Sequence, residues 1–313
     1  MIYFIILICL IVAQLAYFRI AGHFNIIDKP NERSSHKLHT LRGGGIIFYI
    51  GAVFFFIISK FEYPWFFLGL TLISIISFAD DIKQISPKLR MLIQFAGILL
   101  LFFQTGLFTL PLYTIIIALI IFVGILNAFN FMDGINGITG AYSLAVLGAL
   151  WYINAYLIEF VNPQLIYISI LSLLVFNFFN FRTKAKCFAG DVGSVTIAFI
   201  ILFLLGLLMY KTLDLSYIVL LAVYGVDSVL TIVHRIILKE KLMEPHRKHL
   251  FQLLANEKKI PHLVVSSIYA IVQLVIFGGL LVFKNDSYLY LIAVILILSI
   301  LYIVVKRRIY HLH

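Results

Sequence analysis

The chain alternates between long apolar stretches and short polar connections. Apolar runs of about 20 residues are long enough to cross the hydrocarbon core of a bilayer as helices. The pattern therefore predicts an all-α, polytopic membrane bundle of about 10–11 transmembrane helices, forming a single domain over 1–313. The predicted helices are 1–20, 44–59, 65–79, 91–106, 112–127, 138–159, 164–181, 195–210, 216–234, 263–283 and 288–305.

The polar connections fall into two classes that alternate along the chain. The longer ones are 21–43, 80–90, 127–137, 182–194 and 235–262. The short ones hold only three of the 24 Lys and Arg, namely Lys60, Lys211 and Lys284. Because positively charged loops tend to stay in the cytoplasm, the longer loops and the C-terminus are expected inside and the N-terminus outside. Any chemistry is then expected at the cytoplasmic face.

The composition agrees with a membrane protein. Hydrophobic residues make up 63% of the chain and charged residues 12%, against about 25% charged in soluble domains. A net charge of +10 fits cytoplasmic loops beside anionic lipid, and without an aromatic–basic RNA-binding pattern no nucleic acid partner is expected. Cys9 and Cys187 show neither a disulfide framework nor zinc spacing. The first 18 residues lack a basic start, which favours a retained helix over a cleaved signal peptide.

The first long loop is basic and ends in glycines. Arg33, His36 and Arg42 are candidates to bind phosphate, and Gly43–Gly45 follow directly. Glycines at a helix start let backbone amides approach an anion closely. An ordinary basic loop beside the membrane explains the segment equally well.

The second long loop opens with two adjacent acids. Asp80 and Asp81 are followed by Lys83, and neighbouring carboxylates repel each other unless a cation or a shared proton offsets them. A metal ion or a proton-accepting role would explain the pair. The alternative is two solvated acids at a helix end, although acids there oppose the helix dipole.

The third long loop begins with polar residues spaced by three. Asn127, Asn130 and Asp133 share one face if the preceding helix continues. Such a face can contact a nucleoside or a sugar, or support a metal ion. Helix capping is the alternative, but it accounts for one polar residue rather than three.

The fourth long loop places a single acid, Asp191, between Gly190 and Gly193. Mg²⁺ typically takes one or two protein carboxylates and fills its other positions with phosphate oxygens and water. Asp191 is thus a candidate Mg²⁺ ligand. It is also a candidate cap for the helix that follows.

The fifth long loop carries His246, Arg247 and His249, with Gln252 completing a spacing of three from the two histidines. The three could form one polar edge of a helix, and the basic residues suit a diphosphate. No carboxylate accompanies the histidines in a zinc-like pattern. Asp227, inside a predicted helix, is expected to face the bundle, opposite Arg235 or His234, because a lipid-facing carboxylate is costly.

Five segments in this order resemble the polyprenyl-phosphate N-acetylhexosamine-1-phosphate transferases, a glycosyltransferase family 4 type that includes phospho-MurNAc-pentapeptide translocase and GlcNAc-1-phosphate transferases. The matching segments are Asp28-Lys29-Pro30 with Arg33, Ser35 and His36, Arg42 with its glycines, Asp80-Asp81-Ile82-Lys83, Asn127 to Gly134, and Gly190-Asp191-Val192-Gly193-Ser194.

The resemblance implies a specific reaction. A HexNAc 1-phosphate would pass from UDP-N-acetylhexosamine to undecaprenyl phosphate with release of UMP, initiating O-antigen, capsule or a related glycan at a bacterial inner membrane. The run from His246 to Gln252 departs from the three adjacent histidines of the translocase and from the His-x-His-His of the GlcNAc branch. It looks more like the N-acetylfucosamine or N-acetylquinovosamine branch. Leu41 stands where many relatives have proline.

The resemblance also implies roles for individual residues. Mg²⁺, with Mn²⁺ as the alternative, would be held by Asp191 with Asn127, and Asp80 or Asp81 would accept a proton from the lipid phosphate or orient it. An aspartate acting as covalent nucleophile in a two-step reaction stays open, and a homodimer is an implied partner. The expected catalytic residues are Asp80, Asp81, Asp191, His246 and His249, and the expected substrate-binding residues are Arg33, His36, Arg42, Lys83, Asn127, Asn130, Asp133 and Arg247.

Two other functions fit a helical bundle less well. An intramembrane prenyltransferase usually needs two Asp-rich motifs, and this chain has one adjacent pair. A secondary transporter would place charge near the middle of the membrane, whereas the acids of these clusters, Asp227 excepted, are expected at one face.

Overall fold

The computed structural model describes residues 1–28, 40–241 and 246–310. Within these ranges the chain is almost entirely helical, and two short antiparallel strands, β1 (Ile27–Asp28) and β2 (Thr40–Leu41), are its sheet. The α-helices are α1 (Ile2–His23), α2 (Ile46–Ile58), α3 (Pro64–Ile82), α4 (Pro87–Thr105), α5 (Leu112–Met132), α6 (Ile138–Tyr152), α7 (Pro163–Asn180), α8 (Gly190–Thr212), α9 (Ala222–Ile237), α10 (Leu250–Asn256), α11 (His262–Val282) and α12 (Ser287–Tyr310).

The predicted polytopic helical bundle is confirmed. Among the described residues, ten helices are long and apolar enough to cross a membrane. The eleventh predicted span corresponds to α2, which has 13 residues and is therefore only about 20 Å long. The short helix α10 falls inside the predicted loop 235–262.

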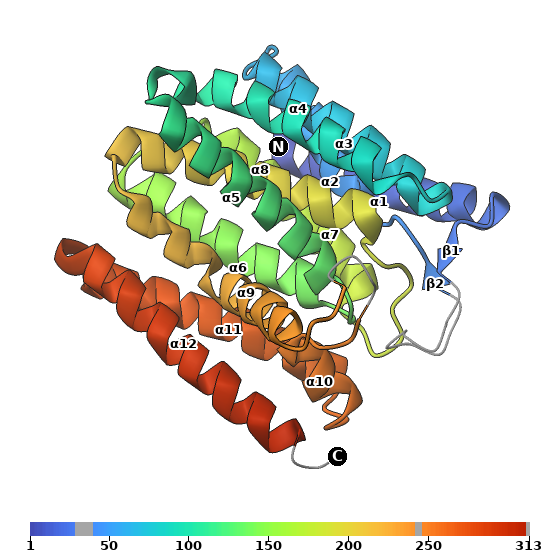
Figure 1. Ribbon diagram of the computed structural model, residues 1–313. Coiled ribbons are helices and arrows are strands. Elements are labelled where there is room, and N and C mark those ends of the chain that lie inside the picture. The colour runs from blue at the N-terminus through green and yellow to red at the C-terminus, as the bar shows by residue number, and fades with distance from the viewer. Residues whose placement is uncertain (29–39, 242–245, 311–313) are drawn as a thin grey trace.

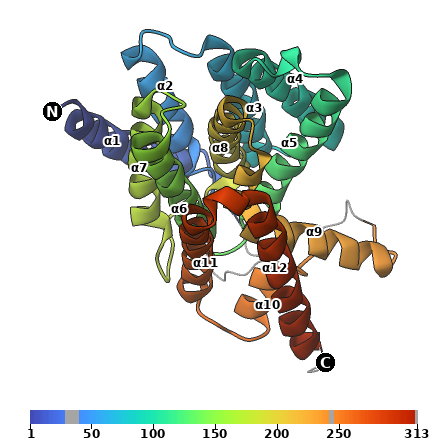
Figure 2. The same ribbon diagram turned by 90° about the vertical axis from the view of Figure 1, so that its left-hand side faces the viewer.

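Helix α8 forms the centre of the bundle. Figure 2 shows α8 between α6 and α7 on one side and α3, α4 and α5 on the other. It is apolar all round, and 89% of its most apolar stretch is buried, as expected of a helix surrounded by protein. Its neighbours therefore fix its position from several sides.

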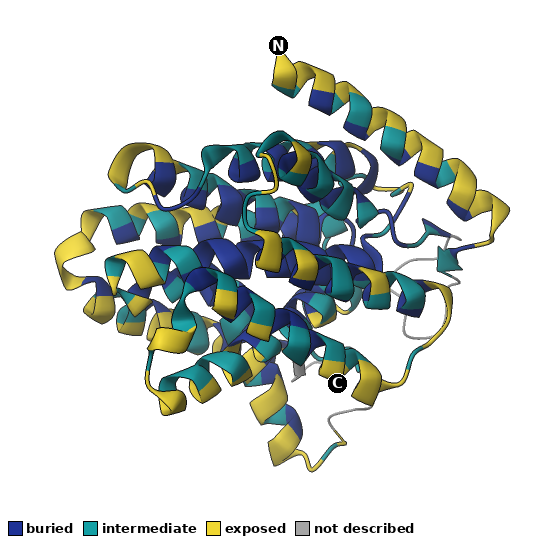
Figure 3. Cartoon of the chain, turned by 90° about the horizontal axis from the view of Figure 1, so that it is seen from above, coloured by how far each residue is buried: buried dark blue, intermediate teal, exposed yellow. Residues whose placement is uncertain are grey.

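The peripheral helices behave in the opposite way. Only 11% of the most apolar stretch of α12 and 17% of that of α5 are buried, and Figure 3 shows exposed residues along α1 and the outer helices. Their large exposed side chains are mostly aliphatic, among them Ile120, Leu289 and Ile300. Apolar surface of this extent is typical of a protein that faces lipid.

The longer polar connections gather at one end of the bundle. In Figure 1, strands β1 and β2, helix α10 and the last turns of α12 lie toward the same, lower right side. A serine cap and prolines start the helices there and elsewhere: Ser86 accepts a hydrogen bond from the amide of Leu89, and Pro87 is the first residue of α4. This arrangement brings the segments with candidate chemistry together.

Candidate active site

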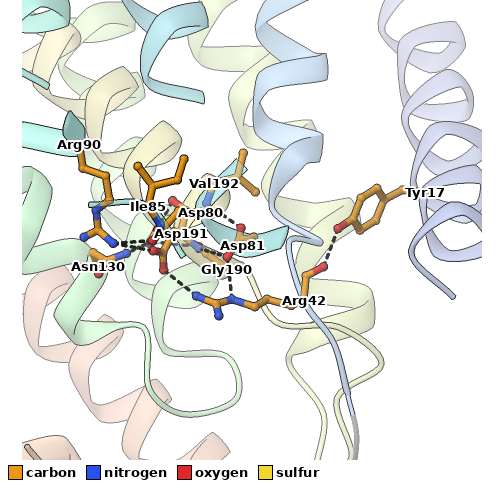
Figure 4. Close-up of polar contacts among 11 residues, drawn as sticks. Tyr17, Arg42, Asp80, Asp81, Ile85, Arg90, Asn130, Gly190, Asp191 and Val192 are labelled. Atoms are coloured by element: carbon orange, nitrogen blue, oxygen red, sulfur yellow. Dashed lines mark hydrogen bonds and ion pairs between the residues drawn. The ribbon is translucent and has the colours of Figure 1, made fainter. Parts of the chain in front are cut away.

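The start of α8 is held by an acid from another helix. Asp81, in the last turn of α3, accepts hydrogen bonds from the amides of Asp191 at 2.9 Å and Val192 at 3.0 Å. Its side chain is completely buried. A carboxylate at a helix N-terminus satisfies free amides and complements the dipole. Asp81 thereby places Asp191 in the first turn of α8, as Figure 4 shows.

The structure also excludes the alternative that Asp191 is the cap residue of this helix. The sequence predicts that this helix begins at 195, whereas α8 begins at Gly190. Asp191 therefore lies inside the helix, with its side chain 17% exposed. The adjacent Gly190 has a φ of +72°, and a Cβ on it would lie 2.5 Å from a carboxylate oxygen of Asp81.

Arg42 joins two of the acids. Its Nε lies 2.6 Å from Oδ1 of Asp81, and its Nη2 lies 3.1 Å from Oδ1 of Asp191. Burial opposes the charge of the guanidinium, but Asp81 and Asp191 outweigh that effect and raise the pKa of Arg42 above its ordinary value. The hydroxyl of Tyr17 donates a hydrogen bond to the Arg42 carbonyl oxygen and fixes the backbone.

Arg90, in the first turn of α4, joins the third acid to the cluster. Its Nη1 lies 2.5 Å from Oδ2 of Asp80 and 3.2 Å from Oδ2 of Asp191. The other oxygen of Asp80 accepts from the amide of Ile85 at 2.6 Å. Five side chains from four segments thus converge, and we call Arg42, Asp80, Asp81, Arg90 and Asp191 the aspartate–arginine cluster.

Glycines allow the loop before α2 to lie directly on α8. The amides of Gly44 and Gly45 donate to the carbonyl oxygens of Phe188 and Ala189. A Cβ on Gly45 would lie 2.2 Å from the Cα of Gly193, so no side chain fits there. These glycines were predicted to approach an anion. In the structure they let the loop that carries Arg42 pack against α8.

The polar face predicted on the third loop is only partly formed as expected. Asn127 and Asn130 lie on α5, and Asp133 directly follows its last residue. Asn130 donates to the hydroxyl of Ser194 on α8 at 3.3 Å, close to the cluster. Asn127 lies one turn away and donates to Gln94.

Asp133 lies against the turn that starts α6. Thr139 donates to its Oδ1 at 2.7 Å. Burial of the carboxyl group raises its pKa to about 6. This acid therefore takes up a proton at a higher pH than an exposed aspartate does.

The remaining predicted residues lie in different places. Arg33 and His36 fall outside the described residues. Lys83 is exposed at the end of α3. His246 and Arg247 are half-buried before α10, and burial lowers the pKa of His246 to about 4.

His249 belongs to a second carboxylate centre. It is the N-cap residue of α10, and its Nδ1 lies 3.4 Å from Oδ1 of Asp227. Gln252 accepts a hydrogen bond from the His249 amide, so these residues form a helix cap rather than the predicted polar helical edge. Asp227 thus pairs with His249, whereas Arg235 pairs with Glu240.

Sequence reasoning missed Arg90. A single basic residue at the end of a predicted loop carries no motif signal. The available hint was the acidic pair ten residues earlier, because two adjacent carboxylates need a cation.

The chemistry of the cluster suits a divalent cation. No group of three or more His, Cys, Asp or Glu among the described residues is placed to hold a metal ion by itself. However, Oδ2 of Asp80 and Oδ2 of Asp191 approach the same nitrogen of Arg90, so two carboxylate oxygens already converge on one cationic position. That number fits Mg²⁺, which takes its remaining ligands from phosphate and water.

Known proteins resemble this chain along most of its length. The chain is 29% identical over 253 residues, 74% of its length and 70% of the relative's, to the probable undecaprenyl-phosphate N-acetylglucosaminyl 1-phosphate transferase of Bacillus subtilis. It is 27% identical to the undecaprenyl-phosphate alpha-N-acetylglucosaminyl 1-phosphate transferase of Escherichia coli K12, covering 75% of this chain and 71% of that one. It is 29% identical to the phospho-N-acetylmuramoyl-pentapeptide-transferase of Thermotoga maritima, covering 78% and 86%.

The family model for glycosyl transferase family 4 matches residues 63–209. This segment contains Asp80, Asp81, Arg90, Asn130 and Asp191, which the fold brings to one end of the bundle. The central segment of this multi-pass membrane protein therefore resembles glycosyl transferase family 4 over slightly less than half of the chain.

Proposed function

We propose that this protein transfers a HexNAc 1-phosphate from a UDP-sugar to undecaprenyl phosphate and releases UMP. A phosphate oxygen of the lipid attacks the sugar-bearing phosphorus of the donor, and the bond between the two donor phosphates breaks. One phosphoanhydride replaces another, so the reaction needs no ATP. The names of the relatives support the lipid acceptor and a sugar 1-phosphate.

One observation carries the proposal: three carboxylates and two guanidinium groups meet at the start of α8. The carboxylates outnumber the arginines, so the site favours an additional cation. Two phosphate-bearing substrates repel each other and need positive charge between them. Two arginines and a bound cation in one buried site would supply that positive charge.

The residues of the cluster would divide the work. Asp191 and Asp80 would hold Mg²⁺, which neutralises charge on the donor diphosphate when bound. Arg42 and Arg90 would donate hydrogen bonds to phosphate oxygens. Asp81 would keep the first turn of α8 in position, because both of its oxygens are already used.

The donor and the membrane side complete the proposal. Asn127, Asn130 and Asp133 remain our candidates for contacts to the nucleoside or the sugar. The longer, basic connections gather at the end of the bundle that carries the cluster, which supports a cytoplasmic site in a bacterial inner membrane. The run from His246 to Gln252 favours a donor other than UDP-GlcNAc within the HexNAc class.

The test is UMP release by purified protein in lipid nanodiscs. The reaction contains Mg²⁺, undecaprenyl phosphate and one of a panel of UDP-N-acetylhexosamines, including the glucosamine, galactosamine, fucosamine and quinovosamine forms. We expect UMP only when both lipid and Mg²⁺ are present, with one donor clearly preferred. Absence of UMP with every donor would contradict the proposal.

Asp191→Asn provides the matched inactive variant. It preserves shape and removes one negative charge, so we expect turnover to fall by at least about 10³-fold, since the group acts on the transferring phosphoryl. Folding is checked by thermal unfolding in detergent. Wild-type turnover in this variant would remove Asp191 as the metal ligand.

A further inference from the structure

The first helix of the chain contacts the aspartate–arginine cluster. Tyr17 on α1 and Arg42 before α2 both precede the segment matched by the family model. Helix α1 is peripheral, because 28% of its most apolar stretch is buried. A contact between this helix and the cluster is therefore not explained by spanning the membrane alone.

The guanidinium of Arg42 depends on the place of its own backbone. It contacts carboxylates on two helices, Asp81 on α3 and Asp191 on α8. The Arg42 side chain is 34% exposed, so packing alone does not hold it, and a long side chain of this kind has much rotamer freedom. Both contacts therefore require that the chain enters the site at a defined point.

The two backbone polar groups of Arg42 are each bound. Its amide donates to the carbonyl oxygen of Ile26 at 3.1 Å, next to the strand pair in which Ile27 lies opposite Leu41. Its carbonyl oxygen accepts from the hydroxyl of Tyr17 at 2.5 Å. The first bond is made by backbone atoms, which every residue type except proline supplies. The second depends on one side chain.

Tyr17 is itself held in place. It is 6% exposed and packs with Ala21. Its ring meets that of Phe78 on α3 edge to face, with centroids 6.3 Å apart. Phe78 lies three residues before Asp81, so one helix positions both the ring of Tyr17 and a carboxylate that contacts the guanidinium.

Gly43 leaves room for the hydroxyl. A Cβ on Gly43 would lie 2.5 Å from the hydroxyl oxygen of Tyr17 and 3.6 Å from Oδ2 of Asp81. A side chain at this position would therefore displace the hydroxyl. Figure 4 shows Tyr17 reaching from α1 to the backbone of Arg42, beside the acids.

We propose that Tyr17 is a positioning residue that places the guanidinium of Arg42 between Asp81 and Asp191 by holding the Arg42 backbone. Tyr17 acts through Arg42 and not on the substrate. The reaction that this placement serves rests on the proposed function, in which the guanidinium donates to phosphate oxygens. Helix α1 is then a working part of the active site.

Tyr17→Phe is the variant of choice, because it keeps the ring and removes the hydroxyl. Tyr49→Phe is its matched control. Tyr49 on α2 stacks on Phe67, and its hydroxyl lies 3.1 Å from that of Thr71, roughly two and a half turns of α3 before Asp80. Each variant thus loses one hydroxyl contact, and thermal unfolding in detergent compares their stability with that of the wild type.

The first test needs no substrate. Protein labelled with ¹⁵N-arginine is studied by NMR in detergent micelles, and Arg42→Lys identifies the Nε–H signal of Arg42. We expect this signal to shift in Tyr17→Phe and its proton to exchange with water roughly 10-fold faster, because the guanidinium leaves Asp81 more often. Tyr49→Phe should leave the signal unchanged. An unchanged signal in Tyr17→Phe, or an equal shift in both variants, would overturn the proposal.

The second test measures turnover in a double-mutant cycle. We expect Tyr17→Phe to lower kcat by about 10-fold, the equivalent in rate of one lost hydrogen bond, and to add no loss when Arg42→Gln is present. Tyr49→Phe should leave kcat unchanged. Wild-type turnover in Tyr17→Phe, or a loss that adds to that of Arg42→Gln, would show that the hydroxyl does not act through Arg42.

The two tests separate this inference from the proposed function. If the Arg42 signal shifts in Tyr17→Phe but the wild type releases no UMP, the proposed function fails and the placement of Arg42 by Tyr17 stands. If the wild type releases UMP and the Arg42 signal does not shift, the proposed function stands and the positioning role of Tyr17 fails.

Discussion

Two acids in this protein do the same structural task with different partners. Asp81 accepts from the amides at the start of α8, and Asp227 accepts from an amide at the start of α10. The remaining partner of Asp81 is the guanidinium of Arg42, which can only donate. Asp227 also accepts from the amide of Phe251, and its other partners are hydroxyls and an imidazole, which can donate or accept.

This difference in partners determines which of the two acids tolerates substitution by an amide. A carboxylate surrounded by obligatory donors must remain a carboxylate. At Asp227 the amides of Leu250 and Phe251 can only donate, but the hydroxyl of Tyr269 can reverse its hydrogen bond and accept from an asparagine side chain. The second centre is therefore expected to tolerate an amide better than the first.

The largest expected effect comes from Asp81→Asn. Its new amide group would face Arg42 or a backbone amide, so two donors would meet inside the protein. We expect a loss of roughly 3–5 kcal/mol in the free energy of unfolding, as when a buried pair is broken. The measurement is thermal or denaturant unfolding in detergent beside Asp227→Asn, for which we expect a smaller loss. Equal losses in the two variants would contradict the comparison.

The next effect concerns Arg90. We expect Arg90→Gln to lower turnover by about 10²-fold, because it removes one charged donor near the transferring phosphate. Lys88→Gln is the control, since Lys88 is exposed in the same first turn of α4. UMP release measures both. If turnover falls only in Lys88→Gln, or equally in both variants, the effect comes from the general positive charge of this turn. The contact of Arg90 with Asp80 and Asp191 would then not be its cause.

A smaller effect is expected where the aspartate–arginine cluster depends on close packing of the backbone. Gly45→Ala would place a methyl group 2.2 Å from the Cα of Gly193, and backbone atoms cannot move aside easily. We expect a loss of about 1–3 kcal/mol in unfolding free energy, as for other overpacked sites. Gly124→Ala is the matched control, because nothing lies within 4 Å of a Cβ there. Equal thermal stability of the two variants would rule out the predicted crowding.

The smallest expected effect is a pH dependence of stability that comes from Asp133. This residue lies between the aspartate–arginine cluster and the centre formed by Asp227 and His249. Burial raises its pKa to about 6 from its ordinary value of 3.8, so the folded protein binds more protons at this group than the unfolded chain does between these values. The contribution of Asp133 to stability should therefore fall as the pH rises from about 4 to about 6. Asp133→Asn should reduce the slope of thermal stability against pH across that range and leave the part that comes from other buried carboxyl groups. An unchanged slope would assign it to another group.

Much of the bundle follows from the sequence because apolar length is a strong signal. The order of helices and loops was predicted, but several ends were not: α5 and α12 end five residues later than predicted and α9 begins six residues later. Helix α8 begins five residues early because Asp81 satisfies its first amides. That contact joins residues 110 positions apart, and local patterns carry no record of it. For the same reason the motif residues Asp80, Asp81 and Asp191 could be named, whereas Arg90 could not.

The partners of Asp227 teach the same lesson. Arg235 and His234 were expected because they follow on the same helix. The fold instead brings in His249, Tyr269 and the amide of Leu250. Leu250 and Tyr269 lie 23 and 42 positions from Asp227 in the sequence, so only the tertiary structure reveals that they meet it.

The burial of α8 has a consequence for the surrounding bilayer. Hydrophobic mismatch acts on helices that face lipid, through tilting and local thinning, and α8 has almost no such surface. Thinner or thicker membranes would therefore strain α5 and α12 first. The spacing between Asp81 and Asp191 is set by contacts within the protein, so acyl-chain length should leave it unchanged.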